Sequence, residues 1–147
     1  MIDYVFDTEP LIAYLYGEPG APDVTERLRA VQNETATGAI AHATAIEIVY
    51  KVSRLETGAP NQVAPGEAEL EVGERDLRVL RGFGLTIETP PWNTVARIKA
   101  AGGISLGDAY AAALASERGG TFVVGSDPEF EDLAVDLDLH RIRTNPA

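Results

Sequence analysis

Residues 2–8 read IDYVFDT, an apolar run that ends abruptly at an acid. The run has the length of a strand and only Asp3 interrupts it, so it predicts a strand over residues 2–6. Asp7 follows directly, and Pro10 comes at a place suited to the first turn of a helix. This stretch therefore predicts a strand that delivers a carboxylate to the rim of a sheet, near the start of a helix.

A second run of the same kind lies near the other end of the chain. Residues 121–125 are the most strand-like segment of the second half, and Ser126 and Asp127 follow them. Between the two runs, strand patterns alternate with helix patterns, which predicts right-handed crossovers and a mainly parallel sheet covered on both faces. In such sheets a site forms beyond the carboxyl ends of the strands, where Asp7 and Asp127 emerge.

The remaining elements follow from apolar periodicity and from breakers such as Gly17, Gly58 and the pair Gly102 and Gly103. A length of 147 residues with 45% hydrophobic composition suits a single domain over 1–147. The expected strands cover about 2–6, 37–41, 85–87, 121–125 and 139–143, and the expected helices about 10–16, 22–31, 44–55, 70–83, 92–101 and 105–116.

Composition excludes several kinds of chemistry. The chain has no cysteine, which removes disulfides, thiolate nucleophiles and cysteine-ligated metals, and it has only two histidines, His42 and His140. Oxygen ligands remain, and hard cations prefer them. No apolar run is long enough to span a membrane and the start lacks a signal peptide, so we expect a cytoplasmic protein without a membrane partner.

The charge balance is unusual for a protein that binds nucleic acid. The formal net charge is -11, and the only lysines are Lys51 and Lys99. Clustered basic residues normally meet a phosphate backbone, so the balance argues against simple electrostatic attraction to one. An acidic, lysine-poor composition is typical of a halophilic, archaeal protein in a salt-rich cytoplasm, where screening weakens repulsion. In that setting the net charge says little about the substrate.

Three aspartates stand where a site could form, and each also has a local explanation. Asp7 fits an N-cap or a turn, and Asp127 fits a turn before proline. Asp108 comes three residues after Ser105, which predicts an N-capped helix whose first turn favours an acid. Each aspartate alone leaves both interpretations open.

Glu47 has the same ambiguity but belongs to a more informative set. It lies in the apolar segment 45–49, where an ionised group needs a partner, although Thr44 and Glu47 also fit a capping box. Taken together, four acids occur at two strand ends and two helix starts that this topology can bring together. Clustered carboxylates repel unless a divalent cation offsets their charge, which favours Mg²⁺ or Mn²⁺ and phosphate-ester chemistry.

Four segments resemble successive motifs of PIN domains, especially those of VapC toxins. They are residues 4–8 (YVFDT), 45–49 (AIEIV), 104–110 (ISLGDAY) and 123–130 (VVGSDPEF). No single motif is specific, but their order and spacing together are, and the resemblance covers nearly the whole chain. It implies the three-layer α/β/α sandwich of PIN domains with a mainly parallel central sheet.

The resemblance also implies roles for individual residues. Thr8 and Ser126 match positions that often carry a small hydroxyl side chain near the metal or the substrate. Glu129 and Asp132 are candidates for an additional acid around the metal. Glu9 departs from the Ser or Asn often found after Asp-Thr, which puts the ligand geometry there in doubt. The implied catalytic and metal-binding quartet is Asp7, Glu47, Asp108 and Asp127.

The function implied is a Mg²⁺-dependent endoribonuclease, with Mn²⁺ as the alternative metal, acting as the toxin of a type II toxin–antitoxin pair. Its partners would be RNA, a VapB-like antitoxin and a second copy of the chain, the dimer being expected also from apolar Ile12, Tyr14 and Leu15. One alternative is a non-catalytic PIN-fold subunit for RNA binding or assembly. Another is a receiver-like phosphoacceptor, which needs a late lysine that neither Lys51 nor Lys99 supplies.

Overall fold

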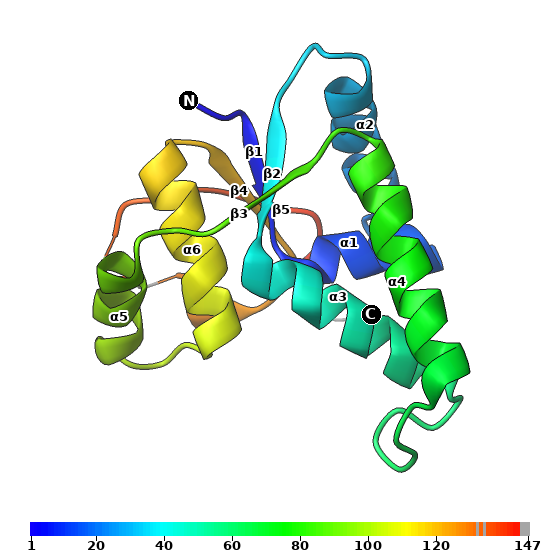
Figure 1. Cartoon of the computed structure of the whole chain (residues 1–147). Helices are drawn as coiled ribbons and strands as arrows, with labels where there is room; N and C mark the ends of the chain where they lie inside the picture. The colour runs from blue at the N-terminus through cyan, green and yellow to red at the C-terminus, as the bar shows by residue number, and fades with distance from the viewer. Residues whose placement is uncertain (132, 134, 145–147) are drawn as a thin grey trace.

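The computed structural model describes residues 1–131, 133 and 135–144. Its centre is a five-stranded sheet in the order β3-β2-β1-β4-β5, and every neighbouring pair is parallel (Figure 1). The predicted parallel sheet is confirmed. The strands are β1 (Tyr4–Phe6), β2 (Gly38–Ala41), β3 (Thr86–Glu88), β4 (Thr121–Val124) and β5 (Asp138–Arg141).

Helices cover both faces of the sheet, which confirms the three-layer α/β/α sandwich. In Figure 1, α5 and α6 lie on one side of the sheet and α1 to α4 on the other. The element order is as expected from the sequence, with boundaries that differ by no more than three residues. The helices are α1 (Thr8–Tyr16), α2 (Ala21–Gln32), α3 (His42–Glu56), α4 (Glu67–Gly82), α5 (Trp92–Ala100) and α6 (Leu106–Arg118), with a 3₁₀ turn, η1 (Pro128–Phe130).

Alternate residues of each strand enter separate hydrophobic clusters, because successive side chains of a strand point to opposite faces. Val5 and Phe122 belong to the cluster under α5 and α6. Phe6 and Val123 belong to the cluster under α1 to α4. All four are fully buried. The central strands are therefore apolar on both faces, as parallel sheets require, and polar residues begin only where the strands end.

Small residues let two helices approach their neighbours closely. Gly73 in α4 lies against the backbone of Val49 in α3, and a Cβ there would overlap the Val49 carbonyl. In α6, residues 111–115 are all buried, and four of the five are alanine. A helix with short side chains on all sides fits between the sheet and α5, which brings the start of α6 close to the strand ends.

Two further expectations concern surfaces. The apolar residues that motivated a dimer are largely covered within the chain: Ile12 is only 8% exposed, and Tyr14 and Leu15 are partly buried against the core. The reason for expecting unused apolar surface at these positions was therefore wrong, because α2, α3 and α4 pack around α1. Among the described residues, no helix is both long enough and apolar enough to cross a membrane.

Candidate metal centre

Asp7 lies at the carboxyl end of β1, at the edge where β4 also ends. Its backbone N–H donates to the Val123 carbonyl at 2.9 Å, so the strand pairing extends as far as this residue. The Asp7 residue is only 4% exposed, and its Oδ1 has no hydrogen-bond partner among the described residues. It occupies the N-cap position of α1 but makes no side-chain cap bond. The N-cap interpretation therefore does not account for the carboxylate.

Asp108 sits in the first turn of α6, where both its backbone and its side chain interact with Ser105. Its backbone N–H donates to Ser105 Oγ at 3.2 Å, which confirms Ser105 as the N-cap. Its carboxyl group also interacts with the Ser105 hydroxyl group, and it faces Glu129 and Asp7 as well. The cap at Ser105 and a role of the Asp108 carboxylate in the site are therefore compatible.

Asp127 and Glu129 are held together by η1. Asp127 Oδ1 accepts from the Glu129 backbone N–H at 2.9 Å, the turn expected of an aspartate before proline. Phe130 is buried with its ring edge-on to Phe122 of β4, with centroids 5.0 Å apart. One ligand oxygen from each of Asp108, Asp127 and Glu129 lies within 4.8 Å of the others, a spacing suited to a shared cation.

Glu47 borders this group from α3. The capping box expected from Thr44 and Glu47 is wrong, because α3 begins two residues earlier at His42 and has no side-chain cap. Glu47 instead lies beyond the first turn, where its Oε1 accepts from Thr8 Oγ1 at 3.4 Å and its Oε2 is 3.7 Å from Lys51 Nζ.

Gly107 leaves space for the Glu47 carboxylate. A Cβ at position 107 would lie 2.6 Å from Glu47 Oε1, so Gly107 allows the start of α6 to pass close to Glu47. Because Gly107 directly precedes Asp108, the same close approach brings α3 and the first turn of α6 to one side of the site.

Burial and like charge raise the pKa of two of these acids. Burial raises the pKa of Asp7 to about 7, and the Glu47 carboxylate contributes to the rise. Burial also raises the pKa of Asp108 to about 9, followed by its interaction with the Glu129 carboxyl group and the charge of Asp7. These carboxyl groups are therefore close enough to oppose one another's ionisation, as expected of carboxylates that bind a divalent cation together.

The donor set fits a divalent cation. Two buried carboxylate oxygens, Asp7 Oδ1 and Glu129 Oε2, have no partner among the described residues, and such atoms are costly unless something binds them. Every candidate ligand is an oxygen, which suits Mg²⁺ or Mn²⁺. The fold and the cluster together define an α/β protein with an oxygen-ligand site for a divalent cation at the carboxyl edge of its sheet.

The expected site residues do not all lie equally close. Asp108, Asp127 and Glu129 form the tight group, and Asp7 adjoins it. Glu47 is connected through Thr8 and acts on Asp7 by charge. The expected additional acid Asp132 lies outside the described residues.

Sequence reasoning did not single out two residues near the site, Lys51 and Arg143. Lys51 follows Glu47 by one helical turn, a spacing visible in the sequence. Arg143 contacts Glu9, and Glu9 receives the Ser126 backbone N–H and hydroxyl. Only the departure of Glu9 from the common motif pointed to this contact.

Comparison with known proteins identifies the family of the chain. A model of the PIN domain family matches residues 4–136, and the chain therefore belongs to the PIN domain family. A sequence search of curated proteins found no significant match.

Solved structures agree with the fold. The chain is similar to VapBC2 of Rickettsia felis bound to a promoter DNA fragment, with a TM-score of 0.69 and 16% identity over 95% of this chain and 98% of that one. DNA-bound VapBC of Salmonella typhimurium gives a TM-score of 0.62 and 22% identity over 97% and 99%. PAE2754 of Pyrobaculum aerophilum gives 0.59 and 21% over 87% and 82%. At these identities the likeness shows the fold.

Proposed function

We propose that this chain, taken as one PIN domain over residues 1–147, is a Mg²⁺-dependent endoribonuclease and the toxin of a type II toxin–antitoxin pair. The observation that carries the proposal is the convergence of the buried Asp7 carboxylate with the half-buried carboxylates of Asp108, Asp127 and Glu129 at the carboxyl edge of a PIN fold. The quartet Asp7, Glu47, Asp108 and Asp127 forms the site, and Glu129 joins it as a ligand.

The acids hold the cation and set its place. Asp108, Asp127 and Glu129 offer three oxygens within 4.8 Å of one another, and Asp7 adds its buried Oδ1, which has no hydrogen-bond partner among the described residues. A divalent cation held by these acids would supply Lewis-acid chemistry, namely polarisation of a phosphate and stabilisation of charge on the leaving oxygen. Mn²⁺ has the same preference for oxygen ligands and is the alternative metal.

Residues beside the acids orient the substrate. Thr8 holds Glu47 through its hydroxyl, which keeps that carboxylate directed at the site. Lys51 has a side chain that is 45% exposed and places its ammonium at the margin of the acid cluster. A fixed cation there attracts the RNA phosphate locally despite a net charge of -11.

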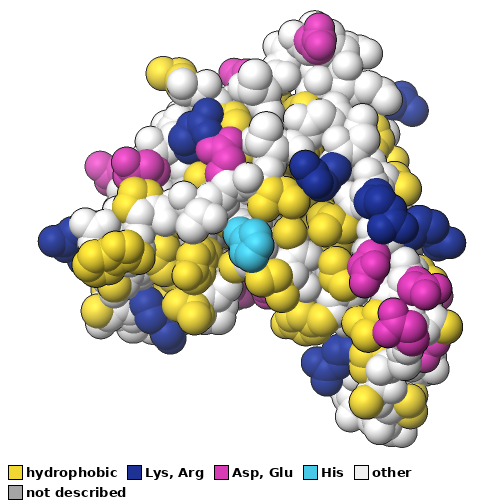
Figure 2. Space-filling model, viewed as in Figure 1, with side chains coloured by type: hydrophobic (Ala, Val, Ile, Leu, Met, Phe, Trp, Pro, Cys, Tyr) yellow, Lys and Arg dark blue, Asp and Glu magenta, His cyan; other side chains and the backbone are white. Residues whose placement is uncertain are grey.

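An apolar hollow next to the site supports a protein partner. It has a volume of about 300 Å³ and runs between the starts of α3 and α6, where Ile46 and Leu106 are 55% and 56% exposed. Figure 2 shows hydrophobic side chains gathered around the middle of this face. Since two similar folds come from VapBC complexes, we assign this surface to a VapB-like antitoxin.

We also propose that the chain forms a homodimer. The support for it is now a set of exposed apolar side chains elsewhere on the surface, in place of the apolar residues of α1. Outside the hollow assigned to the antitoxin, Tyr50 and Val79 are exposed on the described surface. Light scattering at micromolar concentration in high KCl is expected to give twice the monomer mass. A monomer under these conditions would remove the dimer from the proposal.

The decisive experiment is a nuclease assay on total cellular RNA in near-physiological KCl, with Mg²⁺, Mn²⁺ or EDTA, followed by mapping of the cut ends. Cleavage with either metal and none with EDTA is expected. RNA binding without cleavage would favour the non-catalytic PIN-fold subunit instead. The observed strand order gives no support to a receiver-like module, which has the order 2-1-3-4-5 rather than 3-2-1-4-5.

A further inference from the structure

A single oxygen of Glu9 joins two segments that are far apart in the sequence. Glu9 Oε2 accepts from the Ser126 backbone N–H at 3.0 Å and from the Ser126 hydroxyl at 3.4 Å. It also accepts from Arg143 Nε at 2.8 Å. A carboxylate with this many donors is held in one place, and it holds its donors in turn.

Arg143 is the cationic partner and is almost buried, with a side chain only 9% exposed. Besides Glu9, its guanidinium donates from Nη1 to Glu18 Oε1 at 3.2 Å and to the Pro19 carbonyl at 3.1 Å. A planar guanidinium suits several acceptors at once, which an ammonium does not. Arg143 therefore connects the start of α1, the turn after α1 and the segment after β5.

The loop after β4 is held on its other side by β5 and the residue that follows it. The Ile142 backbone N–H donates to the Val124 carbonyl at 3.0 Å, and Arg141 Nη1 donates to the Gly125 carbonyl at 2.8 Å. Gly125 has no room for a side chain, since a Cβ would overlap the Glu9 carboxylate. The backbone of residues 124–126 is thus fixed from both sides.

This fixed loop leads directly into the metal centre. Asp127 follows Ser126, and its carboxylate accepts the Glu129 backbone N–H that starts η1. We propose that Glu9 and Arg143 form a positioning pair that sets the place of Asp127 and Glu129 by holding the Ser126 backbone. The inference rests on the proposed function, because it assigns the pair to the same metal centre.

Charge gives the pair a second effect. Glu9 Oε2 accepts from the backbone N–H of Ser126, the residue before Asp127, so its charge lies beside the acidic site. Without Arg143, Glu9 would be one more uncompensated carboxylate beside an acidic site, free to turn from Ser126. Removing one member of a buried pair leaves the other charge unpaired, so the loss of Arg143 is expected to disturb the site more than the loss of both charges.

The test compares Mn²⁺ affinity by calorimetric titration of the full chain, at a temperature where every variant is folded. Arg143→Gln is expected to weaken Mn²⁺ binding roughly 10- to 100-fold, as residues that orient metal ligands do. Arg143→Lys keeps the positive charge but lacks the planar set of N–H donors of a guanidinium. It should therefore bind Mn²⁺ more tightly than Arg143→Gln and less tightly than wild type. The double variant Glu9→Gln with Arg143→Gln should bind Mn²⁺ better than Arg143→Gln alone.

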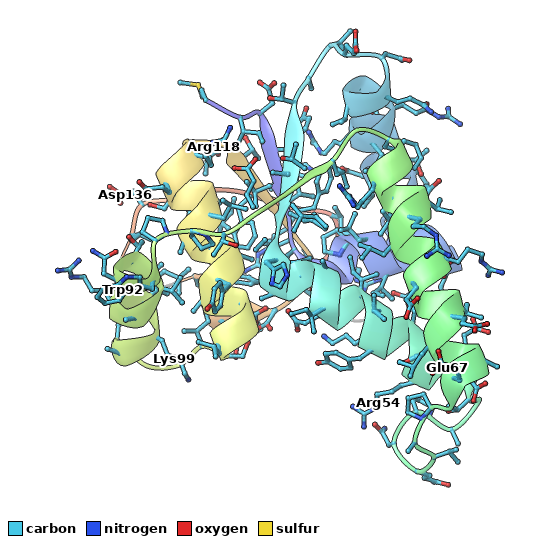
Figure 3. The ribbon with its side chains drawn as sticks, in the orientation of Figure 1. Arg54, Glu67, Trp92, Lys99, Arg118 and Asp136 are labelled. Carbon is cyan, nitrogen blue, oxygen red and sulfur yellow. The ribbon has the colours of Figure 1, made fainter. Side chains whose placement is uncertain are left out.

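A matched control separates positioning from general stability. Arg118→Gln breaks the Arg118–Glu88 ion pair, and Arg118 lies at the end of α6 that is farthest from Asp108 (Figure 3). It should lower the melting temperature and leave Mn²⁺ affinity unchanged. In RNA cleavage at fixed Mn²⁺, Arg143→Gln should reduce kcat with little change in KM, because the RNA contacts remain.

The outcomes are distinct. If Arg143→Gln melts lower than wild type but binds Mn²⁺ equally well, the pair is structural only and the inference is overturned. If Arg143→Gln does not fold, Arg143→Lys and Glu9→Gln carry the comparison. A wild type that binds no Mn²⁺ overturns both the proposed function and this inference. A wild type that binds Mn²⁺ and cuts no RNA overturns the nuclease alone, and the affinities of the variants still decide the inference.

Discussion

Each acid at a helix start or strand end offers two kinds of atom, the backbone N–H and the side-chain oxygens. At Asp108 the backbone N–H donates to Ser105, and the carboxylate, which also interacts with the Ser105 hydroxyl group, faces Glu129 and Asp7. At Asp127 one oxygen holds the η1 turn while the residue still contributes an oxygen to the acid group. Local structure and metal binding are thus combined in the same residues, which makes substitutions that change only the charge informative.

Asp108→Asn is expected to abolish RNA cleavage while leaving the metal-free chain as stable as wild type or slightly more stable. The substitution keeps the backbone N–H that Ser105 caps and removes one of the repelling charges. Mg²⁺ should raise the melting temperature of wild type more than that of the variant. Thermal melts with and without Mg²⁺, beside the nuclease assay, measure both effects.

Ser105→Ala is the matched comparison, since it removes the cap and keeps the acid. It should cost about 1 kcal/mol of stability. If Asp108→Asn retains cleavage and has a lowered melting temperature, Asp108 is a purely structural residue and does not belong to the metal-binding quartet.

The metal-free chain should lose stability as pH rises from about 5 to about 9. Asp7 and Asp108 have folded-state pKa values of about 7 and about 9 against a usual 3.8, so in this window the folded state holds protons that the unfolded chain has released. Stability from such protons is present at low pH and is lost as pH passes the raised pKa values. Urea unfolding in EDTA across this range tests it, and Asp108→Asn should flatten the dependence. Stability that rises with pH would contradict the assignment.

At the scale of elements, close packing of helices decides where the site residues lie. The crossing of α3 and α4 depends on Gly73, which lies on the Val49 backbone, two residues along α3 from both Glu47 and Lys51. The start of α6 depends likewise on Gly107 beside Glu47. Both glycines serve close approach between elements rather than a turn of the chain.

Gly73→Ala should destabilise the fold by ~1–3 kcal/mol, because the new methyl group meets backbone atoms that cannot rotate away. Gly82→Ala, at the end of the same helix, has nothing within 4 Å of the added carbon. It should leave stability unchanged or raise it by up to ~1 kcal/mol. Urea unfolding of the two variants measures the difference, and equal stabilities would refute the close crossing.

At the scale of the whole molecule, charge is distributed unevenly between interior and surface. Arg118 and Arg143 form partly buried ion pairs with acids, while the chain has 23 acidic residues against 12 basic ones. Pairs that hold the fold together are partly buried and screened little by salt, whereas the unpaired surface acids repel through solvent. Salt should therefore act mainly on the repulsion.

The melting temperature should accordingly rise as KCl increases from 0.1 M to about 2 M, because shorter screening lengths weaken repulsion among surface carboxylates. Thermal melts in EDTA keep metal binding out of the comparison. A chain that is equally stable at both KCl concentrations would contradict adaptation to a salt-rich cytoplasm, and the net charge of -11 would again argue against an RNA substrate.

The sequence by itself determined the order and kind of the elements, the parallel sheet and the edge at which Asp7 and Asp127 emerge. These depend on local periodicity, on breakers and on the handedness of crossovers, all of which act over short stretches. Only the tertiary structure decided that α3 starts at His42 rather than at Thr44, and that Glu129 lies with Asp108. It alone paired Glu9 with Arg143, 134 residues away, because such contacts depend on how distant elements pack.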